Sequence, residues 1–169
     1  MDTVEFIRDL DAHMRRLVDD AMQDTTIAQF NWAPPGTASP ISAIFLHLLT
    51  SEDYFIQSVL QGKPRLWESA GWSNKTGVKD TPDFGGNWGS FKQMSLDMEP
   101  MVAYQAAVRL ATDAYLDSLT LVDLERKVKF AGRMDTVAYI FTHTICHTIS
   151  HAGEIAALKG VQGVKGLPY

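Results

Sequence analysis

The chain reads Phe141-Thr-His143-Thr-Ile-Cys-His147-Thr-Ile-Ser-His151-Ala-Gly-Glu154-Ile155 between residues 141 and 155. From Thr136 to Gly153 it contains no aspartate, glutamate, lysine or arginine. A helix that lacks a charged face is buried on most of its sides. The stretch therefore predicts an interior helix of a helical bundle, capped by Asp135 and ending near Gly160, with its histidines inside the bundle.

Three of the five histidines recur in this helix at intervals of four residues. Residues four apart lie one turn apart on the same face, so two such imidazoles can bind one divalent cation. His143 and His151 are separated by about 12 Å of helical rise, too far for both to reach one ion. The pair is therefore either His143 with His147 or His147 with His151, and His47 is the expected third ligand. The alternative is a hydrogen-bonded stack of core histidines.

Three other helices are predicted, over about residues 2–23, 39–61 and 97–119, because apolar residues recur there at helical spacing. Ser39 and Pro40 have the residue types of a cap and a first helical position. Residues 123–134 predict a short helical turn and an extended piece around Gly132. These elements indicate an all-α fold, a single four-helix bundle domain over residues 1–169 with one long crossover loop. His13 falls beside the apolar stripe of the first helix and is interpreted as structural.

The connection over residues 62–96 is much longer than most links between helices. It contains three of the four tryptophans, Trp67, Trp72 and Trp88. Aromatic side chains in such a segment indicate that it folds back over the bundle. The segment is either a lid over a pocket or an ordinary packed crossover, and the sequence favours neither.

Composition excludes several classes of function. Apolar residues make up 46% and charged residues 21% of the chain, and the net charge of −5 gives no basic surface for nucleic acid. No apolar run is long enough for a membrane helix, and residues 1–6 do not have the pattern of a signal peptide. A single cysteine, Cys146, fits a reducing compartment and is expected to be buried as a small apolar side chain. We expect a cytoplasmic protein that binds neither nucleic acid nor membrane.

Other catalytic motifs are lacking. A thermolysin-type protease motif needs glutamate directly after the first histidine, and this chain has Thr144 and Thr148 in the corresponding places. No serine lies in a G-x-S-x-G elbow, and the pair Gly85-Gly86 is too weak a signal to interpret. Glu154 lies close to the His147 side of the helix, where it would orient an imidazole, accept a proton, or serve only as a polar residue near the helix end.

These residues resemble the DinB/YfiT-like superfamily of metal-binding four-helix bundles. The resemblance rests on Ile44-Phe-Leu-His47-Leu-Leu, on His147-x-x-x-His151-x-Gly153-Glu154-Ile155, and on the ending Leu158-Lys-Gly160-Val-Gln-Gly163-Val-Lys-Gly166-Leu-Pro168-Tyr. It covers essentially the whole chain. It implies an up-down-down-up bundle, a homodimer, no binding of DNA, and one divalent metal ion on His47, His147 and His151, with His143 as a neighbour one turn away.

The resemblance also implies a function, because members of the superfamily include metal-dependent transferases that attach mycothiol, bacillithiol or glutathione to electrophiles, and a mycothiol-dependent maleylpyruvate isomerase. Three imidazoles with open coordination positions are typical of a catalytic site, where the ion lowers the pKa of a bound thiol or water. Zn²⁺, Ni²⁺, Co²⁺ and Fe²⁺ all suit such ligands. The expected cosubstrates are a low-molecular-weight thiol and a small electrophile.

The pocket is expected between the second and fourth long helices, with walls formed by Tyr54, Ile140 and Thr144. Two other functions are consistent with the same site. One is a metal-dependent hydrolase, in which water replaces the thiol. The other is a bundle that binds a metal or a small ligand and catalyses nothing.

Overall fold

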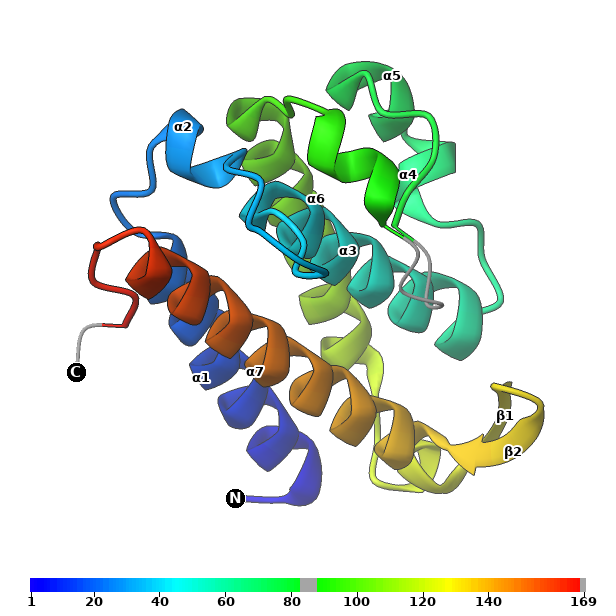
Figure 1. Ribbon diagram of the computed structural model, residues 1–169. Helices are drawn as coiled ribbons and strands as arrows, with labels where there is room; N and C mark the ends of the chain where they lie inside the picture. The colour runs from blue at the N-terminus through cyan, green and yellow to red at the C-terminus, as the bar shows by residue number, and fades with distance from the viewer. Residues whose placement is uncertain (83–87, 168–169) are drawn as a thin grey trace.

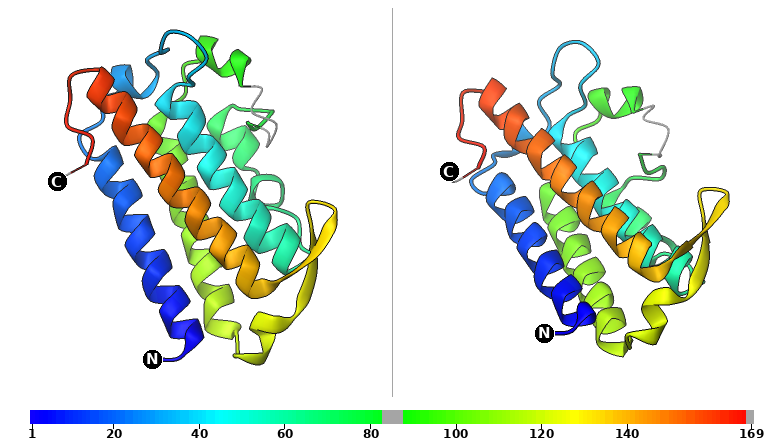
Figure 2. Two further views of the ribbon diagram at one scale, coloured as in Figure 1. Left: turned by 60° about the horizontal axis from the view of Figure 1, so that its bottom comes forward. Right: turned by 90° about the horizontal axis from the view of Figure 1, so that it is seen from below.

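Four long helices form a bundle in the computed structural model, which describes residues 1–82 and 88–167 (Figure 1). They are α1 (Thr3–Met22), α3 (Ile41–Asp53), α6 (Met98–Ser118) and α7 (Val137–Val161). Figure 2 shows α1 and α7 running in one direction and α3 and α6 in the other, with α7 lying between α1 and α3. The predicted all-α, up-down-down-up bundle is confirmed.

Shorter elements connect the long helices. A seven-residue π-helix, η1 (Tyr54–Leu60), continues α3, so the predicted second helix is present but changes its winding at Tyr54. The remaining elements in chain order are α2 (Ile27–Phe30), α4 (Leu66–Ser69), α5 (Trp72–Thr76), η2 (Gly89–Gln93), η3 (Val122–Glu125), β1 (Lys127–Phe130) and β2 (Arg133–Thr136). The extended piece expected around Gly132 is an antiparallel hairpin of β1 and β2.

Side-chain caps mark the starts of α1 and α7, whereas α3 begins after Pro40 without a side-chain cap. The Asp2 carboxylate accepts a hydrogen bond from the Glu5 backbone N–H at 2.9 Å and so starts α1. Thr136, and not the expected Asp135, caps α7 by accepting from the Tyr139 N–H at 3.0 Å. Asp135 belongs to β2 instead, where the hairpin delays the start of the helix by one residue.

The crossover between α3 and α6 is anchored to the bundle at its start. Buried Asp53 accepts hydrogen bonds from the backbone N–H groups of Leu66 and Trp67, each at 2.9 Å, and from the Tyr104 hydroxyl at 2.6 Å. The Trp67 ring packs on the Tyr104 ring with centroids 5.2 Å apart. This half of the segment is a packed crossover, whereas its later half approaches the histidines, as described below. Gly85 and Gly86 lie outside the described residues.

The part of α7 that lacks charged residues, up to Gly153, is not buried all round. Thr142, Cys146, Ile149 and Gly153 are exposed along one side, and 46% of Ile149 is accessible. The expectation that Cys146 is buried was wrong, because α1 and α3 cover two sides of α7 and leave a third side open. The absence of charges along a helix does not tell which of its faces is covered.

No helix in the described part of the chain combines the length and the apolar composition that are needed to cross a bilayer.

A cluster of charges, buried except for Asp113, joins α1 to α3 and α6. Arg15 contacts Asp11 at 2.8 Å, Asp113 at 2.6 Å and Glu52 at 3.3 Å, and Glu52 also accepts a hydrogen bond from the Thr112 hydroxyl at 2.7 Å. Three carboxylates therefore share one guanidinium. Burial, with the nearby charge of Glu52 as the second cause, raises the pKa of Asp11 from 3.8 to about 7.

The raised pKa of Asp11 predicts that Asp11→Asn makes the protein more stable than the wild type at high pH. A carboxyl whose pKa is higher in the folded state stabilises the fold fully below its unfolded pKa of 3.8 and loses that contribution as the pH rises to about 7. The wild type loses this contribution as the pH rises from 4 to 8, and Asp11→Asn does not. Over this range the unfolding free energy of the variant, relative to that of the wild type, should therefore rise by on the order of 2 kcal/mol, measured by urea titration. Asp9→Asn, at an exposed carboxylate of the same helix, is the control. An equal effect of both variants would contradict the prediction.

Candidate metal centre

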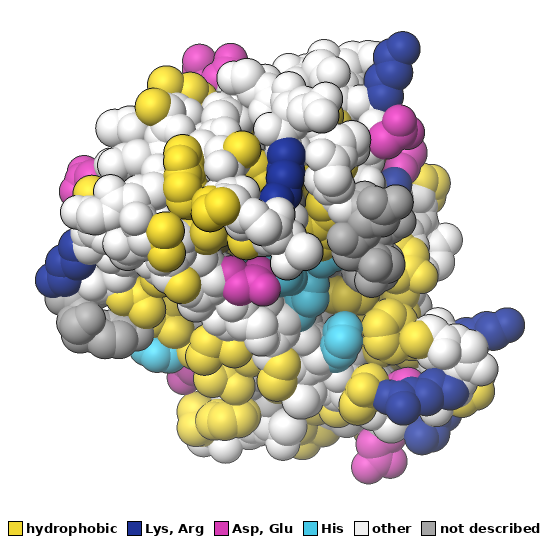
Figure 3. Space-filling model, in the orientation of Figure 1, with side chains coloured by type: hydrophobic (Ala, Val, Ile, Leu, Met, Phe, Trp, Pro, Cys, Tyr) yellow, Lys and Arg dark blue, Asp and Glu magenta, His cyan; other side chains and the backbone are white. Residues whose placement is uncertain are grey.

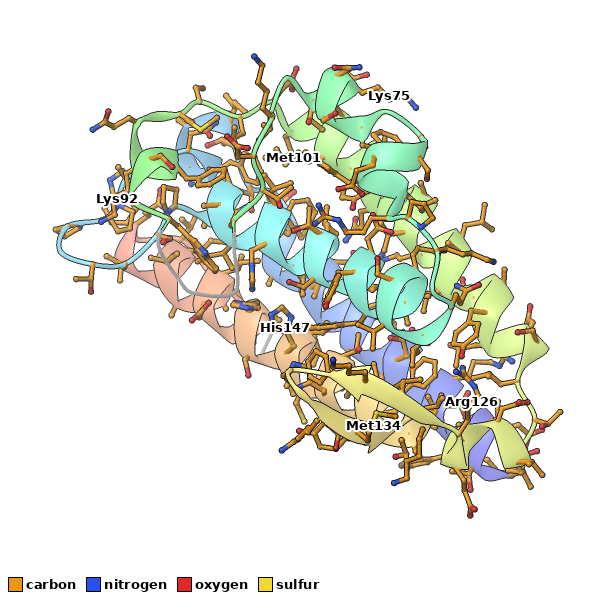
Figure 4. The ribbon with its side chains drawn as sticks, turned by 90° about the vertical axis from the view of Figure 1, so that its right-hand side faces the viewer. Lys75, Lys92, Met101, Arg126, Met134 and His147 are labelled. Carbon is orange, nitrogen blue, oxygen red and sulfur yellow. The ribbon has the colours of Figure 1, made fainter. Side chains whose placement is uncertain are left out.

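Three histidines from two helices meet where α3 lies against α7. The Nε2 atom of His147 is 3.0 Å from Nε2 of His47 and 3.1 Å from Nε2 of His151. The three ligand atoms all lie within 4.8 Å of one another. Figure 4 shows His147 at the junction of the two helices, beside the hairpin. Of the two pairs that the spacing allowed, the structure brings together His147 and His151, and it adds His47.

The outer nitrogens of two of these imidazoles are held by hydrogen bonds. His151 Nδ1 is 2.6 Å from a carboxylate oxygen of Glu154, and His47 Nδ1 is 3.3 Å from the Pro82 carbonyl oxygen. Both partners are acceptors, so each Nδ1 carries the proton and donates it. The Nε2 atoms of His47 and His151 are then unprotonated, and their lone pairs point toward His147. A carboxylate or carbonyl behind a histidine is the usual support of a metal ligand.

His147 is neutral at physiological pH. Burial, reinforced by the neighbouring imidazoles of His151 and His47, lowers the pKa of His147 to about 3. A proton on its Nε2 could bond to only one of the two facing lone pairs, and the Ser51 hydroxyl, 3.4 Å from His47 Nε2, is a further donor to this cluster. A divalent cation would bind all three nitrogens together, and three converging Nε2 atoms, two of them on rings held through Nδ1, are a donor set that fits such an ion.

The other two histidines lie outside the triad. His143 is one turn before His147, with ring centroids 6.3 Å apart, and packs edge-on against Phe55 at 5.1 Å. Burial, followed by the positive charge of Arg133, lowers the pKa of His143. His13 is exposed on α1, where its Nδ1 lies 3.5 Å from an Arg16 nitrogen.

The three triad histidines line a cavity of about 810 Å³. Its other walls are Tyr54, Trp88, Phe130, Ala131, Arg133, Tyr139 and His143. The Trp88 ring lies over His47 with centroids 4.4 Å apart, so the later half of the crossover covers the histidines. Figure 3 shows histidine side chains reaching the surface on this face of the molecule, between an acidic side chain and hydrophobic ones.

The predicted walls of the cavity need revision. Tyr54 lines it as expected, but Thr144 and Ile140 are turned into the core, where the Thr144 hydroxyl donates to the Ile140 carbonyl oxygen at 2.8 Å. The hairpin supplies Phe130 and Arg133 in their place. The only sequence signal for these residues was the extended piece around Gly132, which did not indicate where the hairpin packs.

We expect about one divalent ion per chain in the protein purified without an immobilised-metal column, and none in His147→Ala. Removing His147 takes away the central ligand and leaves two imidazoles on different helices. Plasma mass spectrometry measures the metal content. His13→Ala and His143→Ala are the controls and should keep the ion. A wild-type protein that holds no ion after incubation with excess Zn²⁺ or Ni²⁺ and desalting would establish the hydrogen-bonded stack instead.

Glu154→Gln should keep the site but weaken it. The amide oxygen still accepts the His151 Nδ1 proton, but the negative charge that strengthens the bond is gone. The bond to His151 also lowers the pKa of Glu154, so the carboxylate is ionised at neutral pH. Competition with a chelator should show zinc affinity lowered by about 10- to 100-fold. Glu125→Gln, at an exposed residue outside the site, should leave the affinity unchanged; an equal loss in both variants would count against the role of Glu154.

Comparison with known proteins places this architecture in a family. The chain is similar to a solved structure described as the conserved protein of a locus from Enterococcus faecalis, with a TM-score of 0.77, 19% sequence identity, and coverage of 96% of this chain and 99% of that one. At this identity the likeness shows the fold alone. No curated protein matches the chain significantly. The profile of the DinB superfamily matches residues 10–155, and the chain therefore belongs to the DinB superfamily.

Proposed function

We propose that this protein is a metal-dependent transferase that joins a low-molecular-weight thiol to a small electrophile. One observation carries the proposal. Three imidazoles converge on one side of a cavity of about 810 Å³, so an ion held by them would have open space beside it. Three protein ligands with an open position are typical of catalytic metal sites, whereas structural sites are usually closed by four.

The expected cofactor is one divalent ion, Zn²⁺, Ni²⁺ or a similar metal. When bound, it supplies Lewis acidity, which lowers the pKa of a thiol or water at its open position. The chain itself holds the ligands in place. Pro82 and Glu154 fix which nitrogen of His47 and His151 carries the proton, and Trp88 covers His47 and excludes water from that side.

The nucleophile must come from a second molecule. Cys146, the one cysteine of the chain, is exposed and does not belong to the cavity wall. The cavity wall instead carries four aromatic side chains, Tyr54, Trp88, Phe130 and Tyr139. Apolar walls suit a thiol and an organic electrophile better than they suit bulk water, which favours transfer to a thiol over hydrolysis.

The zinc-loaded wild type should accelerate the reaction of glutathione, mercaptoethanol or cysteine with monochlorobimane, followed by fluorescence. In this reaction the new S–C bond replaces the C–Cl bond, chloride leaves with the electron pair, and the thiol proton goes to solvent. His147→Ala should lose the metal-dependent rate. Cys146→Ser should keep it, because Cys146 lies away from the cavity.

Substitution with Co²⁺ separates the rival functions. Direct binding of a thiol should change the visible spectrum of the Co²⁺ protein. A spectral change with no product from any electrophile would identify a binding bundle without catalysis. Hydrolysis of an activated ester with no thiol dependence would identify a hydrolase. Either result would replace the transferase proposal.

A further inference from the structure

The hairpin places one positive charge on its inner face. Its register pairs Phe130 with Arg133 and Val128 with Asp135, and paired residues of an antiparallel ladder project to the same side. Val128 is buried in the core, so this side faces the bundle. Because side chains alternate along a strand, Lys129 and Met134 project to the opposite side, where both are exposed. Arg133 therefore shares a face with the buried residues.

Arg133 is held in position at the mouth of the cavity. Its Nε donates to a carboxylate oxygen of Asp135 at 2.7 Å, and its guanidinium lies 4.9 Å from the centre of the Tyr139 ring. Asp135 is engaged through Nε, so the edge formed by the two terminal nitrogens faces away from that bond. This edge has the spacing that binds a carboxylate with two parallel hydrogen bonds. More than half of the side chain, 59%, remains accessible.

The charge of Arg133 stands out among the residues that line the cavity. Arg133 is the one lysine or arginine among the described wall residues, and no aspartate or glutamate is among them. Residues 126–133 also contain Arg126, Lys127 and Lys129 without any acidic residue, in a chain whose net charge is −5. A local positive region beside a cavity attracts anions.

We propose that Arg133 binds a carboxylate of the molecule that occupies this cavity, so that the site takes small anionic substrates whose apolar part lies against the aromatic walls. Arg133 then sets specificity from the mouth of the cavity, while the histidine triad acts at its floor. This inference rests on the proposed function for the thiol chemistry. The carboxylate belongs either to the thiol or to the electrophile, and both sources share the same recognition.

The first experiment compares two thiols of similar size that differ in charge, mercaptopropionate and mercaptoethanol, in binding to the Co²⁺-loaded protein. If the thiol carries the carboxylate, Arg133→Gln should lower the affinity for mercaptopropionate by about 10- to 100-fold, as expected for loss of a hydrogen-bonded ion pair. Mercaptoethanol should be unaffected. Lys129→Gln removes an equal charge from the opposite face of the same hairpin and should change neither affinity.

A second experiment uses a carboxylate that has no thiol. Phenylpropionate is titrated by calorimetry into the Zn²⁺-loaded wild type, Arg133→Gln and Arg133→Lys. Its affinity should fall in Arg133→Gln and recover only partly in Arg133→Lys, because lysine keeps the charge but not the paired donors. If the electrophile carries the carboxylate, this dependence appears while the two thiols bind equally to the wild type. Each variant must keep about one ion per chain, which shows that the site is intact.

Two results would overturn the inference. The first is unchanged binding of mercaptopropionate and phenylpropionate in Arg133→Gln. The second is an equal loss in Arg133→Gln and Lys129→Gln, which would mean that only the general field of the hairpin matters. Failure of the proposed function would look different: neither thiol would change the Co²⁺ spectrum, while binding of phenylpropionate would still depend on Arg133.

Discussion

The convergence of three Nε2 atoms between α3 and α7 is the constraint on which the site depends. His47 and His151 each donate their Nδ1 proton outward, so both direct a lone pair at His147. A proton on one Nε2 can reach only one neighbouring Nε2, and the Ser51 hydroxyl, 3.4 Å from His47 Nε2, is a further donor at this point. The packing of the bundle forces this arrangement, because the side of α7 that carries the histidines is pressed against α3. A shared cation would bind all three nitrogens at once.

The long crossover belongs to this centre as much as the helices do. It is anchored at its start by Asp53, whose carboxylate accepts hydrogen bonds from two backbone N–H groups and from the Tyr104 hydroxyl. It then returns to the histidines, where the Pro82 carbonyl accepts the His47 proton and Trp88 covers the ring. The two sequence-based interpretations, packed crossover and cover, therefore describe different halves of one segment. The anchored half fixes where the covering half can lie.

The helices and part of the histidine site could be predicted from the sequence, because buried residues recur at a regular spacing along a helix. The four long helices follow from apolar residues at helical spacing. The grouping of His147 with His151 follows from the spacing of four only as one of two alternatives, and the resemblance to the DinB superfamily selected it. The support from Glu154 was one of several interpretations. These features depend on contacts within one helix or between two long helices, which sequence spacing constrains.

The features that could not be predicted depend on contacts between distant segments. Nothing in the sequence indicates that the Pro82 carbonyl meets His47, because a backbone group has no residue signature. Strands of four residues are too short for alternation to show which side faces inward, so Arg133 was missed. The burial of Cys146 was predicted wrongly for a related reason: a helix without charges does not show which of its sides is covered.

The position of the hairpin decides what kind of site this is. A triad closed in by helices alone would be a structural metal site, since nothing could reach the ion. Here β1 and β2 project beside α7, and Phe130 and Arg133 leave a cavity between the hairpin and the histidines. The wall combines aromatic side chains with the guanidinium of Arg133. Such a wall is typical of a site that binds the apolar part of a ligand by packing and orients it by one polar contact. The bundle therefore provides the three histidines that could hold a metal ion, and the hairpin provides Phe130 and Arg133 at the cavity beside them.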